Sequence, residues 1–103
     1  MLKIYHFYAD WAEDCDVQNS ILEELVRDYD DIIVELVNVD YQEPKAKKYE
    51  IVTIPTLVFE LDKEVVSKIE GLMELEDLED VIDEIFSEEY EEEEFWDDSP
   101  DTQ

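Results

Sequence analysis

Residues 7–15 read Phe7-Tyr8-Ala9-Asp10-Trp11-Ala12-Glu13-Asp14-Cys15, and this stretch joins an apolar run to an amphipathic one. The preceding run, residues 2–8, is apolar on both alternating faces, as a central parallel strand covered by helices requires. From Ala12 to about Tyr29, apolar residues recur at helical spacing and charged residues fill the other positions. The sequence therefore predicts a buried strand, an aromatic corner and a surface helix whose first turn carries the only cysteine.

The start of this helix is marked by acidic residues. We expect Asp10 or a neighbouring acid to cap the open N–H groups of the first turn. Glu13, Asp14 and Asp16 add negative charge near the positive end of the helix dipole, which stabilises the helix.

The segment after the helix predicts a second strand and a short helix. Residues 32–39 form a β-branched run, which is typical of a buried strand. Strand–helix–strand crossovers are right-handed almost without exception, so we expect the first two strands to be parallel. Pro44 is well placed for the first turn of a short helix that ends at Tyr49, with Ala46 facing inward.

The second half of the chain predicts a hairpin and a last helix. Two alternating runs, residues 56–61 and 64–69, flank the polar pair Asp62-Lys63, which indicates an antiparallel hairpin. Gly71, the only glycine, ends the second of these strands. Apolar residues return at helical spacing from residue 75 to residue 86. The predicted order is βαβαββα, in one α/β domain.

Length and cysteine content fit a single domain without disulfides. At 103 residues the chain is long enough to bury roughly 60–65% of its unfolded surface. A single cysteine forms no internal disulfide, and the sequence has neither a leader pattern nor a long apolar run. We therefore expect a cytoplasmic protein.

Acidic residues outnumber basic ones by 33 to 7, which gives a formal net charge of −26. This charge excludes unaided binding to nucleic-acid phosphates or anionic membranes, so a large partner is expected to be a protein with a basic surface. Three interpretations stay open: adaptation to high salt, a solubilising tail, or mimicry of a polyanion at a basic site. The many lysines and isoleucines count against the first.

The charge is concentrated at the C-terminus, where residues 71–103 contain none of the bases and almost half of the acids. We predict a domain over residues 1–86 and an acidic, disordered tail over residues 87–103, because adjacent carboxylates repel one another. Large apolar side chains stand among these acids, and they either fold back on the domain or insert into a partner. They are Tyr90, Phe95 and Trp96.

Several motifs resemble the thioredoxin family at close to its spacing. The corner W-x-x-x-C is similar to the W-C-x-x-C of thioredoxins, and the T-I-P-T sequence that ends at Thr56 is similar to their cis-proline loop. Asn38-Val39-Asp40, the segment from Ala46 to Tyr49 and Gly71 also match. The resemblance covers residues 2–86. It implies a minimal thioredoxin-like fold, in which a four-stranded mixed sheet is flanked by three helices, without the additional N-terminal strand and helix of longer members.

The resemblance also implies a peptide-docking groove. In this family the proline that matches Pro55 is cis and lies beside the active-site thiols, where the preceding backbone pairs with a substrate strand. We therefore expect Pro55 to face Trp11 and Cys15 across a shallow groove that binds peptides by strand addition. The expected peptide-binding residues are Trp11, Glu13, Asp14, Ile54 and Pro55.

The catalytic residues that the family implies are largely replaced. Ala12 occupies the position of the nucleophilic cysteine, and Cys15 matches the resolving cysteine. Disulfide exchange needs both thiols, and the acids beside Cys15 disfavour its thiolate, so we predict a poor nucleophile that acts as a small buried hydrophobe. The other replaced positions are His6 for the buried carboxylate, Leu36 for its lysine neighbour, Glu13-Asp14 for Gly-Pro and Ser20 for the helix-kinking proline.

Two hypotheses follow from these residues. The first is a thioredoxin-fold protein without dithiol activity, which binds a protein through the groove, the acidic tail or both. The alternative is a thiol-disulfide oxidoreductase, which holds if Ala12 stands in place of a native cysteine. We expect no cofactor and no metal site, because one cysteine and one histidine on different elements do not make a ligand set.

Overall fold

The computed structural model describes the backbone of residues 1–95 and the side chains up to residue 87. Within this range the predicted order βαβαββα is confirmed. The elements are β1 (Leu2–Tyr8), α1 (Glu13–Val26), β2 (Ile32–Asn38), α2 (Glu43–Lys48), β3 (Thr56–Leu61), β4 (Glu64–Glu70) and α3 (Leu75–Phe95).

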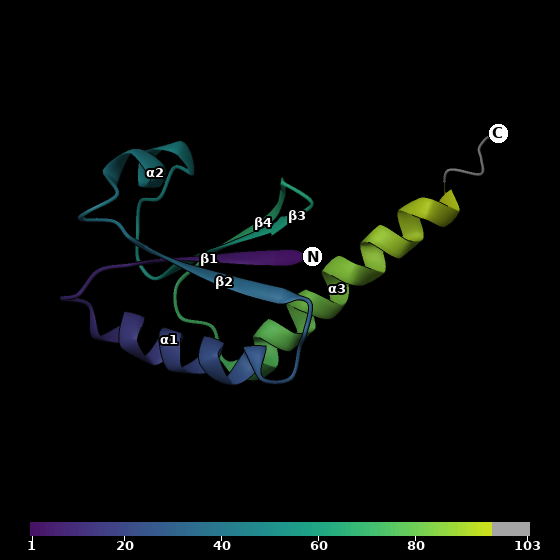
Figure 1. Ribbon diagram of the computed structural model, residues 1–103, viewed down its shortest axis with the longest axis horizontal. Coiled ribbons are helices and arrows are strands. Elements are labelled where there is room, and N and C mark those ends of the chain that lie inside the picture. The colour runs from purple at the N-terminus through teal and green to yellow at the C-terminus, as the bar shows by residue number, and fades with distance from the viewer. Residues whose placement is uncertain (96–103) are drawn as a thin grey trace.

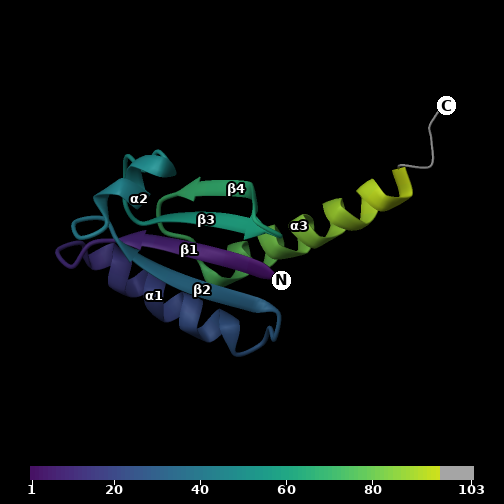
Figure 2. The same ribbon diagram turned by 45° about the horizontal axis from the view of Figure 1, so that its top comes forward.

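The four strands form one mixed sheet in the order β2-β1-β3-β4. Strand β1 is parallel to β2 and antiparallel to β3, and β4 is antiparallel to β3. Figure 2 shows β2 and β4 at the two edges, with α1 beside β2. The predicted fold class, a four-stranded mixed sheet with three helices, is confirmed.

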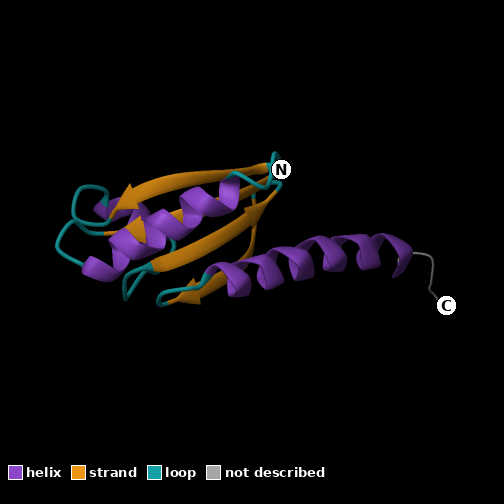
Figure 3. Ribbon diagram, turned by 90° about the horizontal axis from the view of Figure 1, so that it is seen from below, coloured by secondary structure: helices purple, strands orange, loops and turns teal. Residues whose placement is uncertain are grey.

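Helices cover both faces of the sheet. Helices α1 and α3 lie on one face and α2 lies on the other (Figures 1 and 3). The larger core cluster fills the layer between the sheet and the helix pair, where Phe59, Leu22 and Leu78 are fully buried. A smaller cluster around Phe7 and Val58 lies on the opposite face. The two central strands therefore have apolar side chains on both faces, as a strand covered by helices on each side requires.

The hairpin turn and the end of β4 use left-handed backbone. Asp62 and Lys63 have φ values of 53° and 72°, the conformation of a two-residue turn whose twist matches the strands it joins. Gly71 has a φ of 95°, which a residue with a side chain adopts only with strain. Its N–H donates to the carbonyl of Pro55 at 2.8 Å, so the end of β4 is tied to the start of β3.

The two ends of α1 differ from the prediction. The N-cap residue is Ala12, which has an extended backbone and no side chain that accepts a hydrogen bond, so the expected acidic cap is wrong. Asp10 instead accepts a hydrogen bond from the side-chain amide of Asn38 at 3.4 Å. The helix ends at Val26, before the predicted Tyr29, because the next two N–H groups bond three residues back and tighten the last turn.

Helix α3 continues to Phe95, past the boundary expected at residue 86 (Figure 1). Glutamate is a good helix former, and over residues 87–95 this preference favours a helical backbone where charge repulsion alone predicted disorder. The side chains of Tyr90 and Phe95 and the whole of Trp96 lie outside the described residues, so their role as partner anchors stays a prediction. The same holds for the division of the chain into a domain and a tail.

Candidate functional site

The corner between β1 and α1 is closed by main-chain hydrogen bonds. The N–H of Ala12 donates to the carbonyl of Ala9 at 3.3 Å, and the N–H of Cys15 donates to the carbonyl of Ala12 at 3.1 Å. The first bond turns the chain out of the strand, and the second begins the helix. The backbone alone thus sets where residues 11 and 12 lie.

The Trp11 side chain is presented at this corner in a defined orientation. It is 71% exposed, but its indole N–H donates to Asp40 Oδ2 at 3.1 Å. Asp40 is held in turn, because its N–H donates to Asn38 Oδ1 at 2.9 Å. The indole is therefore both solvent-accessible and oriented.

The loop before β3 faces this corner. The peptide bond between Ile54 and Pro55 is cis, as the resemblance implies. The Thr56 hydroxyl donates to the carbonyl of Thr53 at 2.7 Å, which closes the loop across the cis bond. Within residues 1–95, no other main-chain group bonds to the N–H or carbonyl of Ile54. In the described part of the chain, these two groups therefore make no main-chain hydrogen bond.

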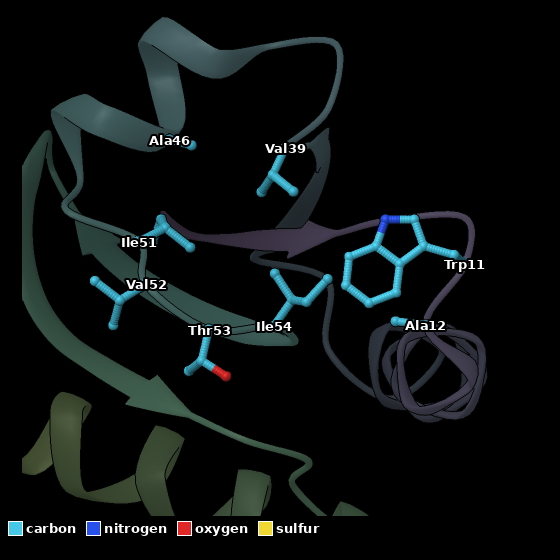
Figure 4. A pocket seen from close by; sticks show the side chains of 8 residues that line it. All are labelled: Trp11, Ala12, Val39, Ala46, Ile51, Val52, Thr53 and Ile54. Atoms are coloured by element: carbon cyan, nitrogen blue, oxygen red, sulfur yellow. The ribbon is translucent and has the colours of Figure 1, made fainter.

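Between the corner and the loop lies an apolar groove of about 440 Å³, called the corner groove below. Figure 4 shows the Trp11 ring at one end beside Ile54 and Val39, and Ile51 and Val52 at the other end. Its lining is drawn from the corner, the segment after β2, α2 and the loop before β3: Trp11, Ala12, Val39, Ala46, Ile51, Val52, Thr53 and Ile54.

The predicted peptide-binding residues fall into three groups. Trp11 and Ile54 line the corner groove, whereas Pro55 is buried beside it. Glu13 and Asp14 are exposed on the first turn of α1 and do not line it.

Sequence reasoning missed the part of the lining that follows β2 and precedes Ile54. One signal was available: Val52 is an apolar residue next to the T-I-P-T motif and outside any predicted strand or helix, and it is almost fully exposed. An exposed branched aliphatic residue beside a docking loop indicates a contact surface.

Cys15 does not line the corner groove. Its side chain is buried and lines a separate hollow of about 170 Å³, called the His6 hollow below. The residues of this hollow are His6, Tyr8, Cys15, Asp16, Asn19 and Leu36. The physical reason is the start of the helix: Ala12 is the N-cap and has an extended backbone at the corner, whereas Cys15 lies inside α1 on the side that packs on the sheet.

The environment of Cys15 opposes ionisation. Burial raises the pKa of the Cys15 thiol above its ordinary value, and the carboxylates of Asp16 and Asp14 raise it further. A backbone hydrogen bond with Ala9 lowers this pKa but does not offset burial. Because the thiolate is the nucleophile in disulfide exchange, this direction of the pKa predicts a poorly reactive Cys15 thiol at neutral pH.

His6 is buried on the α1 side of the sheet and lies opposite Leu36 in the β1–β2 register. Among the side chains up to residue 87, none lies within hydrogen-bond geometry of either ring nitrogen of His6. The amide of the neighbouring Asn19 donates to Glu23 instead, at 3.4 Å. Burial lowers the pKa of His6 to about 4, although the side chain of Asn19 opposes this shift. His6 is therefore a neutral polar group that faces the His6 hollow, with Asn19 as the side chain that counteracts part of the effect of burial.

Acidic and metal-ligating side chains are scattered over the described part of the chain. They form no group of three or more His, Cys, Asp or Glu arranged to hold a metal ion there. Among the helices of the same part, none combines the length and the apolar composition needed to cross a membrane.

A mixed sheet of this order, an aromatic strand-to-helix corner and a facing cis-proline loop define a thioredoxin-like domain. The family model described as Thioredoxin matches residues 2–84, and the chain belongs to the thioredoxin family. A thioredoxin of Staphylococcus epidermidis is 39% identical over 85 residues, which cover 80% of each chain. A thioredoxin of Staphylococcus haemolyticus is 38% identical over the same share of both chains, 80%.

Solved structures show the same relationship. A mutant thioredoxin from Halobacterium salinarum superposes with a TM-score of 0.76 at 31% identity, covering 81% of this chain and 73% of that one. The thioredoxin of Fasciola hepatica gives a TM-score of 0.75 at 28% identity, covering 81% and 79%. The resemblance found in the sequence is confirmed at the level of family and fold.

Proposed function

We propose that this protein is a thioredoxin-fold binding module without dithiol chemistry, and that it holds an extended segment of a protein partner in the corner groove. The observation that carries the proposal is the separation of groove and thiol. The groove is open and apolar and carries an oriented, exposed Trp11, whereas Cys15 is buried outside it. What the groove offers a ligand is contact surface, not a nucleophile.

The partner segment binds by strand addition. The free N–H and carbonyl of Ile54 pair with its main chain, while Trp11 and Val52 supply apolar contact at the two ends of the groove. Large aromatic side chains are the residues that most often dominate binding free energy in interfaces. Trp11 is therefore the main anchor in this proposal.

Charge favours a basic partner. Glu13 and Asp14 are exposed beside the groove on the first turn of α1, and the whole chain has a net charge of −26. Such a field steers cationic surfaces toward the groove and repels anionic ones. The acidic C-terminal segment, with Tyr90, Phe95 and Trp96, adds a second contact that occupies a basic site on the partner. The proposed location is the cytoplasm, with no cofactor.

A matched pair of variants tests the anchor. Peptides selected from a random display library with the full chain provide the probe, and Trp11→Ala is compared with Tyr41→Ala, because Tyr41 is 79% exposed and outside the groove. We expect Trp11→Ala to weaken binding about tenfold or more, and Tyr41→Ala to change it less than about twofold. A selected peptide pool that binds both variants as tightly as the original chain removes the corner groove from the proposal.

The electrostatic part has its own test. Binding of the selected peptides should weaken steeply between about 50 and 500 mM salt, since exposed charges are screened over about 10 Å at 0.1 M. Truncation after Ser87 should reduce binding to a basic partner but leave binding to the groove intact. Association that does not change with salt removes electrostatics from the proposal.

The oxidoreductase alternative rests on one local observation. The N–H of Cys15 donates to the carbonyl of Ala12, so residues 12 and 15 lie within one helical turn at the N-terminus of α1. A thiol at residue 12 would have the position in which helix N-termini lower thiol pKa values, with Cys15 next to it. The relatives named thioredoxin agree with that activity for a chain with a cysteine at residue 12.

A further inference from the structure

Strand β2 leaves one side of the sheet unpaired. It bonds to β1 only, and among residues 1–95 no other segment pairs with its outer edge. In a parallel pair, alternate residues of the outer strand point their N–H and carbonyl groups away from the sheet. Ile33 and Leu36 are large apolar side chains on this edge, and both are 45% exposed. An exposed apolar edge is a template for pairing with another chain.

The opposite edge is protected, as natural edges commonly are. Strand β4 pairs with β3 through a bulge between Phe59 and Glu60, and bulges twist an edge away from regular pairing. It also carries Lys68, whose ammonium group bonds to the carbonyls of Tyr49 and Glu50.

Strand β2 has neither kind of protection. Its register with β1 is continuous, and its one charged residue, Glu35, is engaged by two lysines on the α2 side of the sheet. The charge of Glu35 therefore does not guard the other side of the strand, where Val34 and Leu36 face α1.

A trough runs along β2 on its α1 side. It has a volume of about 190 Å³ and is called the edge trough below. Its lining consists of Asn19, Leu22, Glu23, Val26, Val34 and Leu36. Asn19 and Leu36 also line the His6 hollow, so the two cavities adjoin along the strand. An apolar trough therefore adjoins a buried imidazole whose two nitrogens lack a hydrogen-bond partner among the side chains up to residue 87.

We propose that the outer edge of β2 and the edge trough bind an extended segment of a basic protein partner as an added strand. Side chains of a strand alternate between faces, so every second residue of this segment enters the space between β2 and α1. One such residue is apolar and fills the trough beside Leu36. The next inward residue, about 7 Å further along, is small and polar and lies beside Asn19 and Leu36, which line both cavities.

Charge selects the occupant. Asp16 and Glu23 are exposed on the α1 rim of the two cavities, and neither forms an ion pair within the described side chains. A segment with lysine or arginine beside its apolar residues meets this rim with complementary charge. A second copy of the chain is disfavoured, because each copy has a net charge of −26. This site draws on α1 and β2 and is independent of the corner groove.

The probe is a synthetic peptide whose central residues are valine, serine, threonine, serine and valine, with a pair of lysines at each end. Its inward residues are then valine and threonine in alternation. It is titrated into the full chain and followed by amide NMR. We expect shifts and slowed amide exchange centred on residues 33–37, together with a shift of the His6 ring nitrogens. The same peptide with alternate main-chain amides methylated should bind about tenfold more weakly or worse, since it cannot pair along one edge.

A matched pair of variants shows which edge of the sheet binds the peptide. Leu36→Lys and Val66→Lys introduce the same charge at residues that are 45% and 41% exposed on opposite edges of the sheet. We expect the first to weaken peptide binding about tenfold or more. The second, like Trp11→Ala, should leave binding within about twofold, with all three chains folded by circular dichroism.

Three results would overturn the proposal. If the two lysine variants weaken binding equally, the peptide binds through non-specific charge attraction and not at the edge of β2. Shifts centred on β4 or on the corner groove would move the site. A concentration-dependent dimer that Leu36→Lys dissociates would assign the edge to a second copy instead of a basic partner.

Discussion

The two cavities beside the first turn of α1 differ in what they expose. The corner groove is larger, open and apolar, and its lining residues carry no ionisable carboxylate, imidazole or thiol. The His6 hollow has less than half the volume, and three such groups line it, namely His6, Cys15 and Asp16. At the N-terminus of α1, the accessible surface and the ionisable side chains thus belong to two different cavities. A residue at position 12 meets the groove, whereas a residue at position 15 meets the core.

The largest expected effect comes from placing a thiol on the open side. Ala12→Cys should raise the rate at which the reduced chain reduces a disulfide at pH 7 by roughly 100-fold over the original chain, with the two thiols at positions 12 and 15 oxidised to a disulfide in the same step. The reason is that a helix N-terminus lowers the pKa of a thiol toward neutrality, whereas the pKa of Cys15 is held above its ordinary value. The measurement is reduction of a protein disulfide by the pre-reduced chain.

Val17→Cys provides the control for this gain. Val17 is about half-exposed on α1 beyond its first turn, so the variant adds an accessible second thiol without the position at the helix end. Its rate of disulfide reduction should stay near that of the original chain. If Val17→Cys gains as much activity as Ala12→Cys, a second exposed thiol of any kind explains the activity, and the corner has no special role.

A substitution in the His6 hollow should change the free energy of unfolding and not the rate of disulfide reduction. A buried polar group without a partner costs about 1–3 kcal/mol, so His6→Leu should raise the free energy of unfolding by about that amount at pH 7. Gln18→Leu is the matched control. Gln18 is equally buried but bonds to the main chain of Met73 in both directions, so this variant should lose stability.

The gain from His6→Leu should also grow on acidification. The folded pKa of His6, about 4, lies below the unfolded value of about 6.5, so the unfolded chain binds more protons between these values and stability falls as pH falls through this window. The full difference corresponds to about 3 kcal/mol, which the leucine variant does not lose. Denaturant titrations of both chains at about pH 7 and pH 4.5 measure this. A difference that stays constant with pH would contradict a neutral, buried His6.

Much of the fold can be predicted from the spacing of apolar and turn-forming residues. The apolar run of residues 2–8 and the β-branched run of residues 32–39 specify buried strands, and Asp62-Lys63 specifies a tight turn between two alternating segments. The ends of the helices are harder to predict from the sequence. Ala12 stands at the N-cap of α1 without a side-chain hydrogen bond, and glutamates continue α3 past residue 86. In both places no side-chain capping signal marks the boundary.

The candidate site was only partly predictable. Trp11 and Ile54 were found through motifs, but Val39 and Ile51 join the groove because of where β2 ends and how the chain crosses from α2 to the cis-proline loop. The direction of Cys15 depends on the phase of α1 against the sheet, which starts at an N-cap that the sequence does not mark. The missing hydrogen bonds of His6 depend on its neighbours in space, and no local pattern encodes them.

The smallest expected effect concerns Cys15 alone and decides whether the chain lacks thiol chemistry. The measurement is the rate of Cys15 alkylation by iodoacetamide as a function of pH, with the same chain unfolded in denaturant as the reference. Burial and the adjacent carboxylates predict a rate at pH 7 that is about tenfold or more below the unfolded reference and still rising above about pH 9. A rate above the unfolded reference that levels off at or below about pH 7 would contradict the assignment of this domain as a binding module without a reactive thiol.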